Sequence, residues 1–400
     1  MIDVIAVATT AMLAFALYRL RGNERWRAAA TPLASIIGSG FLIIAPLLHA
    51  LVGRYALLAL AGLGALAYAV GMVLRYNIGR AEPLAQDEPE HAIVRFDRLS
   101  QLVLGAAYAI SVAFYARLFV AFLGDRVSLP TSPESATTVL LAGVATIAWH
   151  RGTRGLENIE LATVTVKVAI IAGVLAGLAW FALEQPAPWF QHDPTLGLGP
   201  GETLAVLAGL LMVTQGFETT RFTGAHYSPQ ARVRAARDSQ HIALVLYFAF
   251  IGLTCPLFLL YPIEALTETT VSWTLGNLAL TLPLLLLVAA TASQLSAALA
   301  DTIGGGGLLR GLLPLAASER VVYLMLVAVA IVIVWSVDVF GIIAFASRGF
   351  ALFYLMQTLV ACALLLRERP LRPFVLAVTA VLALLLAAVV LFAAPAPHAS

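Results

Sequence analysis

Long apolar segments recur along the whole chain, separated by short stretches that hold most of its charge. Twelve of these segments approach the ~20 residues that a helix needs to cross a bilayer. A leading segment at about 2–18 is followed by eleven spans, at about 28–50, 55–76, 99–123, 136–149, 157–183, 203–222, 242–261, 278–301, 321–335, 339–366 and 374–394. The pattern predicts an all-α polytopic membrane protein.

Two of the spans are interrupted at their centres by glycine and polar residues. The interrupted stretches are Gly38, Ser39 and Gly40 in span 1, and Thr214, Gln215, Gly216 and Phe217 in span 6. At 1.5 Å per residue, the breaks lie roughly 15 and 20 Å into their spans, near the membrane midplane. Small residues also let helices pack closely. Corresponding breaks in two halves of a chain, however, indicate the binding site of a secondary transporter.

The positions of the arginines predict the orientation and an internal symmetry. Nineteen of the 24 basic residues follow the leading segment or spans 2, 4, 6, 8 and 10. Cytoplasmic loops carry such an excess, so both termini are predicted to be extracytoplasmic. Spans 1 and 6 then run in opposite directions, which makes residues 28–183 and 199–368 two inverted five-span repeats. Residues 1–27 form a leading helix with a basic cytoplasmic loop, and residues 369–400 form a final helix and tail.

Composition and motifs narrow the function class. The chain is 61% hydrophobic and 12% charged, whereas soluble domains are about 25% charged. Cys255 and Cys362 lie inside apolar segments and are expected to be small core residues, not metal ligands. No hydrolase, metalloprotease or phosphate-loop motif is present. We expect a non-enzymatic protein with no cofactor, no metal and no nucleic-acid partner, whose transport runs on gradients or exchange.

Several motifs together carry a resemblance to the amino acid–polyamine–organocation (APC) superfamily. They are Gly38-Ser39-Gly40-Phe41 with Pro46, Gly216-Phe217-Glu218 with Pro229 and Arg232, residues 158–167, and residues 340–367. The resemblance implies a leucine-transporter-type fold of five-plus-five inverted repeats with alternating access, here with an extra N-terminal helix. Gln215 through Arg221 also resembles a little-characterised bacterial branch, which implies a multi-pass protein of the bacterial inner membrane.

The resemblance also implies how a substrate would bind. The N–H groups of the first break would receive a carboxylate, as helix N-termini favour anions. Carbonyls freed in the second break would accept an ammonium. The expected partners are a small organic solute, such as an amino acid or related amine, and membrane lipids; a homo-oligomeric state is left open. The alternative is a solute sensor or channel-like protein that uses the same fold.

Lys167 is the only lysine in the chain. It lies roughly 15 Å into span 5, and an ionisable residue at this depth is by default a functional candidate. The resemblance implies that it occupies the place of a sodium ion, near span 8 groups such as Ser293 and Ser296. Lys167 is then either a proton carrier or a fixed structural cation, and both interpretations predict sodium-independent transport.

Three further charged residues are candidates for coupling or gating. Glu218 follows the second break and either latches the inner half of span 6 or gates the inward path. Asp301, at the inner end of span 8, is solvated, pairs with an arginine or binds an ion. Arg348 faces the permeation path or pairs with one of the two acids.

Overall fold

The computed structural model describes residues 1–38, 40–125, 127–128, 130–151, 156–185, 193–223, 227–263, 266–312 and 318–396. Every regular element in these ranges is helical. The α-helices are α1 (Ile2–Arg19), α2 (Glu24–Gly38), α3 (Phe41–Val52), α4 (Ala56–Asp87), α5 (Ala92–Gly124), α6 (Pro133–Arg151), α7 (Leu156–Glu184), α8 (Pro200–Gly209), α9 (Pro229–Leu260), α10 (Thr270–Gly276), α11 (Thr281–Leu312), α12 (Glu319–Ser336), α13 (Val339–Arg367) and α14 (Pro373–Phe392). Short 3₁₀ segments are η1 (Leu20–Gly22), η2 (Gly53–Tyr55), η3 (Leu211–Thr214) and η4 (Phe217–Arg221).

The helices reproduce the predicted spans. Eight helical segments among the described residues are long and apolar enough to cross a membrane, with α3 and α4 counted as one. The other predicted spans correspond to α2, α6, α8 and α12, which fall short in length or hydropathy. Helices α2 and α8 are short because each is the first half of a broken span. The chain is therefore a multi-pass membrane protein of the predicted fold class.

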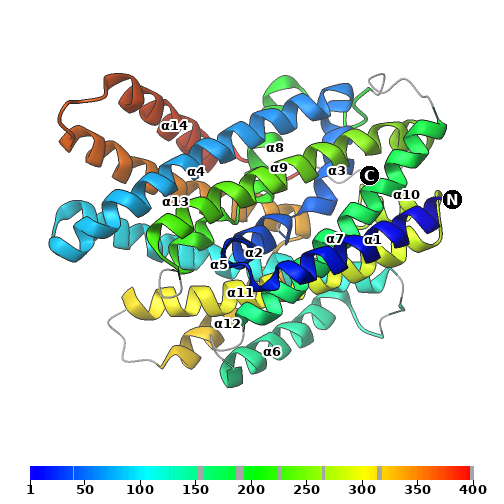
Figure 1. Cartoon of the computed structure of the whole chain (residues 1–400), viewed down its shortest axis with the longest axis horizontal. Coiled ribbons are helices and arrows are strands. Elements are labelled where there is room, and N and C mark those ends of the chain that lie inside the picture. The colour runs from blue at the N-terminus through cyan, green and yellow to red at the C-terminus, as the bar shows by residue number, and fades with distance from the viewer. Residues whose placement is uncertain are drawn as a thin grey trace.

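The centre of the bundle is built around α5 and α11, which pack against each other more extensively than any other pair of described helices. Glycines permit this approach. A Cβ on Gly105 would lie 2.5 Å from Leu309, and a Cβ on Gly305 would lie 3.3 Å from Tyr108. Figure 1 shows the long helices running roughly side by side along the molecule.

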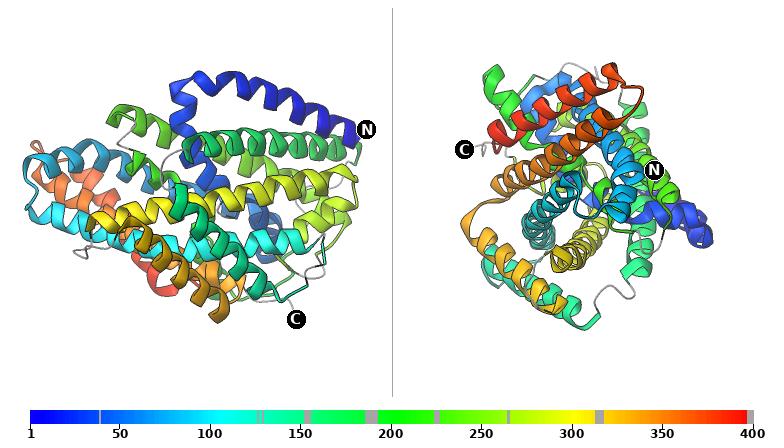
Figure 2. Two further views of the ribbon diagram at one scale, coloured as in Figure 1. Left: turned by 90° about the horizontal axis from the view of Figure 1, so that it is seen from below. Right: turned by 90° about the vertical axis from the view of Figure 1, so that its left-hand side faces the viewer.

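The leading helix α1 lies on the periphery of the bundle. This position agrees with its place outside the two predicted repeats. It packs mainly along α7 and touches α11 only weakly. Figures 1 and 2 show it on the outside of the bundle beside α7. Among the described cavities, none at the two breaks is lined by α1. This helix therefore covers one side of the bundle without forming part of its centre.

Candidate functional site

Span 1 is interrupted where the sequence predicts. Helix α2 ends at Gly38 and α3 begins at Phe41. Gly40 has φ 119°, a left-handed conformation that favours glycine. A Cβ at this position would lie 3.1 Å from Val213 of span 6. Ser39, a predicted site residue, lies outside the described residues.

Span 6 is interrupted over a longer stretch. After α8, only the 3₁₀ segments η3 and η4 follow, and Gln215 and Gly216 between them are not helical. Gly216 has φ 131°. A Cβ on Gly216 would lie 2.5 Å from the backbone nitrogen of Ile36 and 2.7 Å from the carbonyl carbon of Ser35. The prediction that both spans are unwound is confirmed.

The two broken spans touch each other directly next to the breaks, at the contacts of Gly40 with Val213 and of Gly216 with Ile36. Among the described residues, the cavities next to the breaks have volumes of about 20 Å³ and about 10 Å³. A single water needs about 10–15 Å³. The backbone of Gly216 packs directly against Ser35 and Ile36 of α2, and each of these two cavities has room for only about one or two waters.

A tyrosine of span 7 joins the two breaks. The Tyr247 hydroxyl lies 3.0 Å from the Ile36 carbonyl oxygen of span 1 and 2.6 Å from the Val213 carbonyl oxygen of span 6. Its ring packs edge-on against Phe41, with ring centroids 5.0 Å apart. The hydroxyl holds one hydrogen, so it donates to one of these carbonyls at a time. Sequence reasoning missed this residue because a tyrosine in an apolar span carries no distinctive signal.

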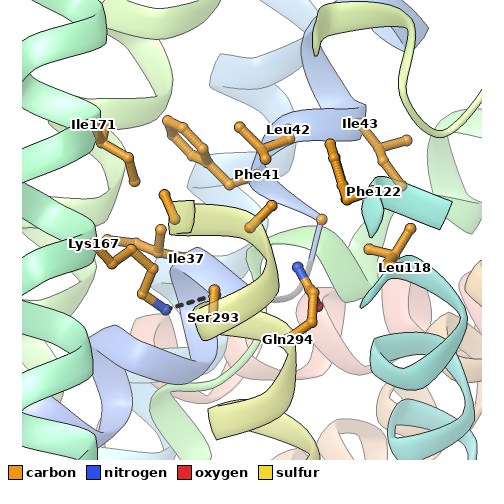
Figure 3. A pocket seen from close by; sticks show the side chains of 13 residues that line it. Ile37, Phe41, Leu42, Ile43, Leu118, Phe122, Lys167, Ile171, Ser293 and Gln294 are labelled. Atoms are coloured by element: carbon orange, nitrogen blue, oxygen red, sulfur yellow. Dashed lines mark hydrogen bonds between the residues drawn. The ribbon is translucent and has the colours of Figure 1, made fainter. Parts of the chain in front are cut away.

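Lys167 lies at the predicted junction of spans 1, 5 and 8. Its Nζ donates to the Ala34 carbonyl oxygen of α2 at 2.8 Å and to Ser293 Oγ of α11 at 2.9 Å. The side chain is only 2% exposed. Figure 3 shows it reaching from α7 towards Ser293 beside a small cavity that Phe41 also lines. The ammonium therefore ties the first half of the broken span 1 to span 8.

Glu218 caps the break that precedes it. Its Oε2 accepts hydrogen bonds from the Gly216 backbone nitrogen and from the Tyr354 hydroxyl of α13, each at 2.8 Å. The side chain is fully buried, and its other oxygen, Oε1, has no hydrogen-bond partner among the described residues. The carboxylate thus fixes the backbone of the span 6 break to span 10.

Asp301 and Ser296 are both buried on α11. Asp301 is 2% exposed, so it is not solvated. One of its carboxylate oxygens accepts a short hydrogen bond from the Ser111 hydroxyl of α5. Ser296 is 5% exposed, and its hydroxyl has no hydrogen-bond partner in the part of the chain that the structure describes. Of the two predicted serines, Ser293 is therefore the one that contacts Lys167.

Further polar side chains gather against the breaks. The Tyr115 hydroxyl of α5 lies next to the side chains of Ser35 in α2 and Gln215 in the span 6 break. All three residues are at most 5% exposed. Thr214 is also buried, and its hydroxyl donates to the Leu211 carbonyl oxygen at 3.1 Å. The structure thus brings together the predicted residues of both breaks with polar groups of α5.

Arg348 is not part of this site. It lies on the exposed side of α13. Its Nε and Nη2 donate to the Ala393 carbonyl oxygen, at 3.0 and 2.5 Å, just past the end of α14. A cation is stabilised at a helix C-terminus. The prediction that Arg348 faces the permeation path or pairs with a buried acid is wrong, because the depth of a residue does not tell which side of a helix it occupies.

A buried network that sequence reasoning missed lies beyond η4. Arg221 Nη2 pairs with Asp97 of α5 at 3.0 Å, and Arg221 Nη1 donates to Gln357 Oε1 of α13 at 2.6 Å. The Gln357 amide in turn donates to Asp97 at 2.6 Å. Arg232 of α9 forms a two-pronged ion pair with Glu82 of α4. In sequence the two arginines entered only the orientation count and the family resemblance, since their pairing with acids depends on tertiary packing.

The broken spans, the buried polar centre and the helical bundle define a membrane transporter of the leucine-transporter type. Residues 3–393 match a family model described as an APC superfamily transporter. The chain belongs to this superfamily and is a non-enzymatic membrane transporter. It is also 37% identical to an uncharacterized protein of Aquifex aeolicus (strain VF5) over 348 residues, 86% of this chain and 84% of that one.

Solved structures resemble the fold at low sequence identity. One is a manganese transporter of Eremococcus coleocola, 16% identical, with a TM-score of 0.57 over 92% of this chain and 86% of that chain. Another is a nucleobase-cation-symport-1 family transporter in a closed conformation with bromovinylhydantoin bound. It is 12% identical, with a TM-score of 0.59 over 88% of this chain and 80% of that chain. These similarities concern the fold.

Proposed function

We propose that the protein is a secondary active transporter of a small organic solute, an amino acid or related amine, that works by alternating access without sodium. The observation that carries this proposal is the position of Lys167. Its ammonium donates to a carbonyl of span 1 and a hydroxyl of span 8. By the family resemblance, this is the place that a sodium ion occupies in sodium-coupled members. A fixed positive charge there repels a second cation.

The charges at the centre favour an amine. Two buried carboxylates, Glu218 and Asp301, lie near the same tyrosine, Tyr108 of α5. Lys167 is the buried cation on the span 5 side. Glu218 Oε1 has no hydrogen-bond partner among the described residues, so it is an acceptor available to an ammonium group of the solute. Pairing of the two would satisfy the buried carboxylate.

Alternating access needs a barrier on each side of the solute. We assign the inner barrier to the network of Arg221, Asp97 and Gln357, which lies beyond the break on the predicted cytoplasmic side. It joins η4 to α5 and α13 through side chains. Breaking it frees the inner half of span 6, so its opening would lead to the cytoplasm.

Coupling without sodium leaves protons or a counter-solute as the driving gradient. Lys167 is either the proton carrier or the fixed cation that holds spans 1, 5 and 8 together. Both roles use the two hydrogen bonds described above. A pH-dependent uptake that Lys167→Ala removes supports the first role, and pH-independent exchange supports the second.

We do not transfer the substrates of the similar solved structures to this protein, because those structures share its fold at low sequence identity. Within the described ranges, no group of three or more His, Cys, Asp or Glu side chains is placed to hold a metal ion. The proposed solute class is based on the backbone and polar groups at the two breaks, and not on a metal site. We also propose a bacterial inner-membrane location with both termini extracytoplasmic; a cysteine at the exposed Val4 that labels only from the cytoplasm would overturn this orientation.

Counterflow tests the proposal. A thermal-shift screen of amino acids, polyamines and nucleobases on the purified protein first selects a binding solute. Proteoliposomes loaded with that unlabelled solute should then accumulate the labelled solute transiently, because a carrier exchanges one for the other. A channel equilibrates the label without such accumulation, and a sensor takes up none; either result rejects the carrier.

A further inference from the structure

The leading helix α1 is outside the two repeats, yet it is held in place at several points. Its longest contact is with α7, the helix that carries Lys167. Figure 2 shows α1 lying along α7 on the outside of the bundle. Of the residues of α1, Ala6 is the one that is buried. A helix with so little burial needs specific contacts to stay in one place.

Two glycines of α7 provide the first of these contacts. A Cβ on Gly173 would lie 2.0 Å from Thr10 Oγ1 and 2.5 Å from the Ala6 carbonyl oxygen of α1. A Cβ on Gly177, one turn further along α7, would lie 3.1 Å from Ile2. Small residues four apart let two membrane helices approach closely and gain packing energy. The backbone of α1 therefore sits directly on this glycine face.

Asp3 provides the second contact, and it reaches a different helix. Its Oδ1 accepts hydrogen bonds from the Thr281 backbone nitrogen at 3.0 Å and from Thr281 Oγ1 at 2.6 Å. Thr281 is the first residue of α11, where backbone N–H groups have no partner within the helix. A carboxylate there satisfies one of these donors and interacts favourably with the helix dipole.

We infer that α1 is a clamp that fixes α7 on α11, with Asp3 as its positioning residue. The clamp is anchored on α7 six residues from Lys167, about 9 Å along the helix axis. On α11 it is anchored twelve residues from Ser293, about 18 Å along the axis. These two helices supply both ends of the Lys167–Ser293 hydrogen bond.

The clamp has a consequence for movement within the bundle. If α7 is fixed on α11, the helices that rearrange at the breaks are α2, α3 and α8, which flank the two breaks. The functional meaning of the clamp rests on the proposed role of Lys167. The existence of the clamp does not depend on that role, so it can be tested without any transported solute.

Distance measurements between spin labels test the clamp in the full chain, with Cys255 and Cys362 replaced by alanine. One label pair is placed at the exposed positions Leu183 on α7 and Leu284 on α11. A reference pair joins Leu284 to the exposed Val139 on α6. We expect Asp3→Ala to broaden the α7–α11 distance distribution towards longer distances and to leave the reference pair unchanged.

A conservative variant at Asp3 distinguishes the loss of the α11 cap from a general loss of protein stability. Asp3→Asn keeps an oxygen that accepts from Thr281, and asparagine caps helices as well as aspartate does. It should restore the narrow distribution. An Asp3→Ala protein with an unchanged α7–α11 distribution, or one in which both label pairs broaden equally, would overturn the proposal.

The glycine contact is tested in the same way. Gly173→Ala should broaden the α7–α11 distribution, because the added methyl overlaps the backbone of α1. Gly143→Ala on α6 is the matched control, since a Cβ there meets nothing within 4 Å. A Gly173→Ala protein that gives the same distribution as Gly143→Ala contradicts the clamp, whether or not the protein transports an amine.

Discussion

Replacing Gly216 by alanine is the sharpest perturbation of the contact between the breaks. The residue has φ 131°, a region that residues with a Cβ rarely adopt. The new methyl would lie 2.5 Å from the Ile36 backbone nitrogen, whereas real Cβ contacts essentially never fall below 3.0 Å. The two spans must therefore separate by at least about 0.5 Å, and the Glu218 bond to the Gly216 nitrogen moves with them.

The expected loss of stability has two parts. A left-handed conformation costs a residue with a Cβ roughly 1–2 kcal/mol relative to glycine. Forcing an extra methyl into a well-packed interior costs typically about 1–3 kcal/mol. Both act on the same residue, so Gly216→Ala should lower the free energy of unfolding by about 2–5 kcal/mol.

Thermal unfolding of the purified protein in detergent measures this loss against a matched variant. Gly79→Ala adds a methyl inside α4, where a Cβ meets nothing within 4 Å. Alanine is favoured over glycine inside a helix, by up to about 1 kcal/mol. We expect a clear fall in melting temperature for Gly216→Ala and none for Gly79→Ala. Equal melting temperatures for the two variants would refute the direct packing of the breaks.

Two further predictions concern side-chain contacts that hold the broken spans in place. Tyr247→Phe removes the hydroxyl that bridges the two breaks and leaves buried carbonyls without it, so it should lower stability by about 1–3 kcal/mol; a melting temperature equal to that of the wild type contradicts the bridge. Asp97→Asn removes a partner of the buried Arg221, and breaking a buried pair costs about 3–5 kcal/mol. The control is Glu134→Gln, which affects the more exposed pair of Arg117 and Glu134 and should cost less than about 1 kcal/mol. Equal losses of stability for Asp97→Asn and Glu134→Gln in thermal unfolding would show that the network is not buried.

Much of the fold could be predicted because the bilayer imposes simple rules. Span length and the need to satisfy backbone groups in lipid predicted the helices and the two breaks. The orientation predicted by the positive-inside rule stays a prediction. Lys167 was predicted for the same reason: a charge in the middle of a span has few tolerable surroundings. Its partner Ser293 followed from the family resemblance.

Other features depend on side-chain directions that spacing does not give. Arg348 was predicted from its depth along the span, but its side chain lies on the exposed side of the helix and bonds to the Ala393 carbonyl oxygen. Glu218 folds back on its own break, which requires the unusual backbone at Gly216. The pairing of Arg221 with Asp97 joins residues 124 positions apart, and no periodic pattern predicts it. The capping of α11 by Asp3 is equally non-local, since it spans 278 positions.

The central claim is that Lys167 takes the place of a coupling sodium ion. Its most direct test is gradient-driven uptake of the solute selected by the binding screen, in proteoliposomes with sodium or choline as the cation. We predict equal uptake in both, dependence on a pH gradient or on counter-solute, and loss of uptake in Lys167→Ala and Lys167→Arg. The first variant removes the ammonium, and the second brings a larger planar head that does not lose its proton. Uptake that requires sodium, or a Lys167→Ala protein that transports normally, would contradict the claim.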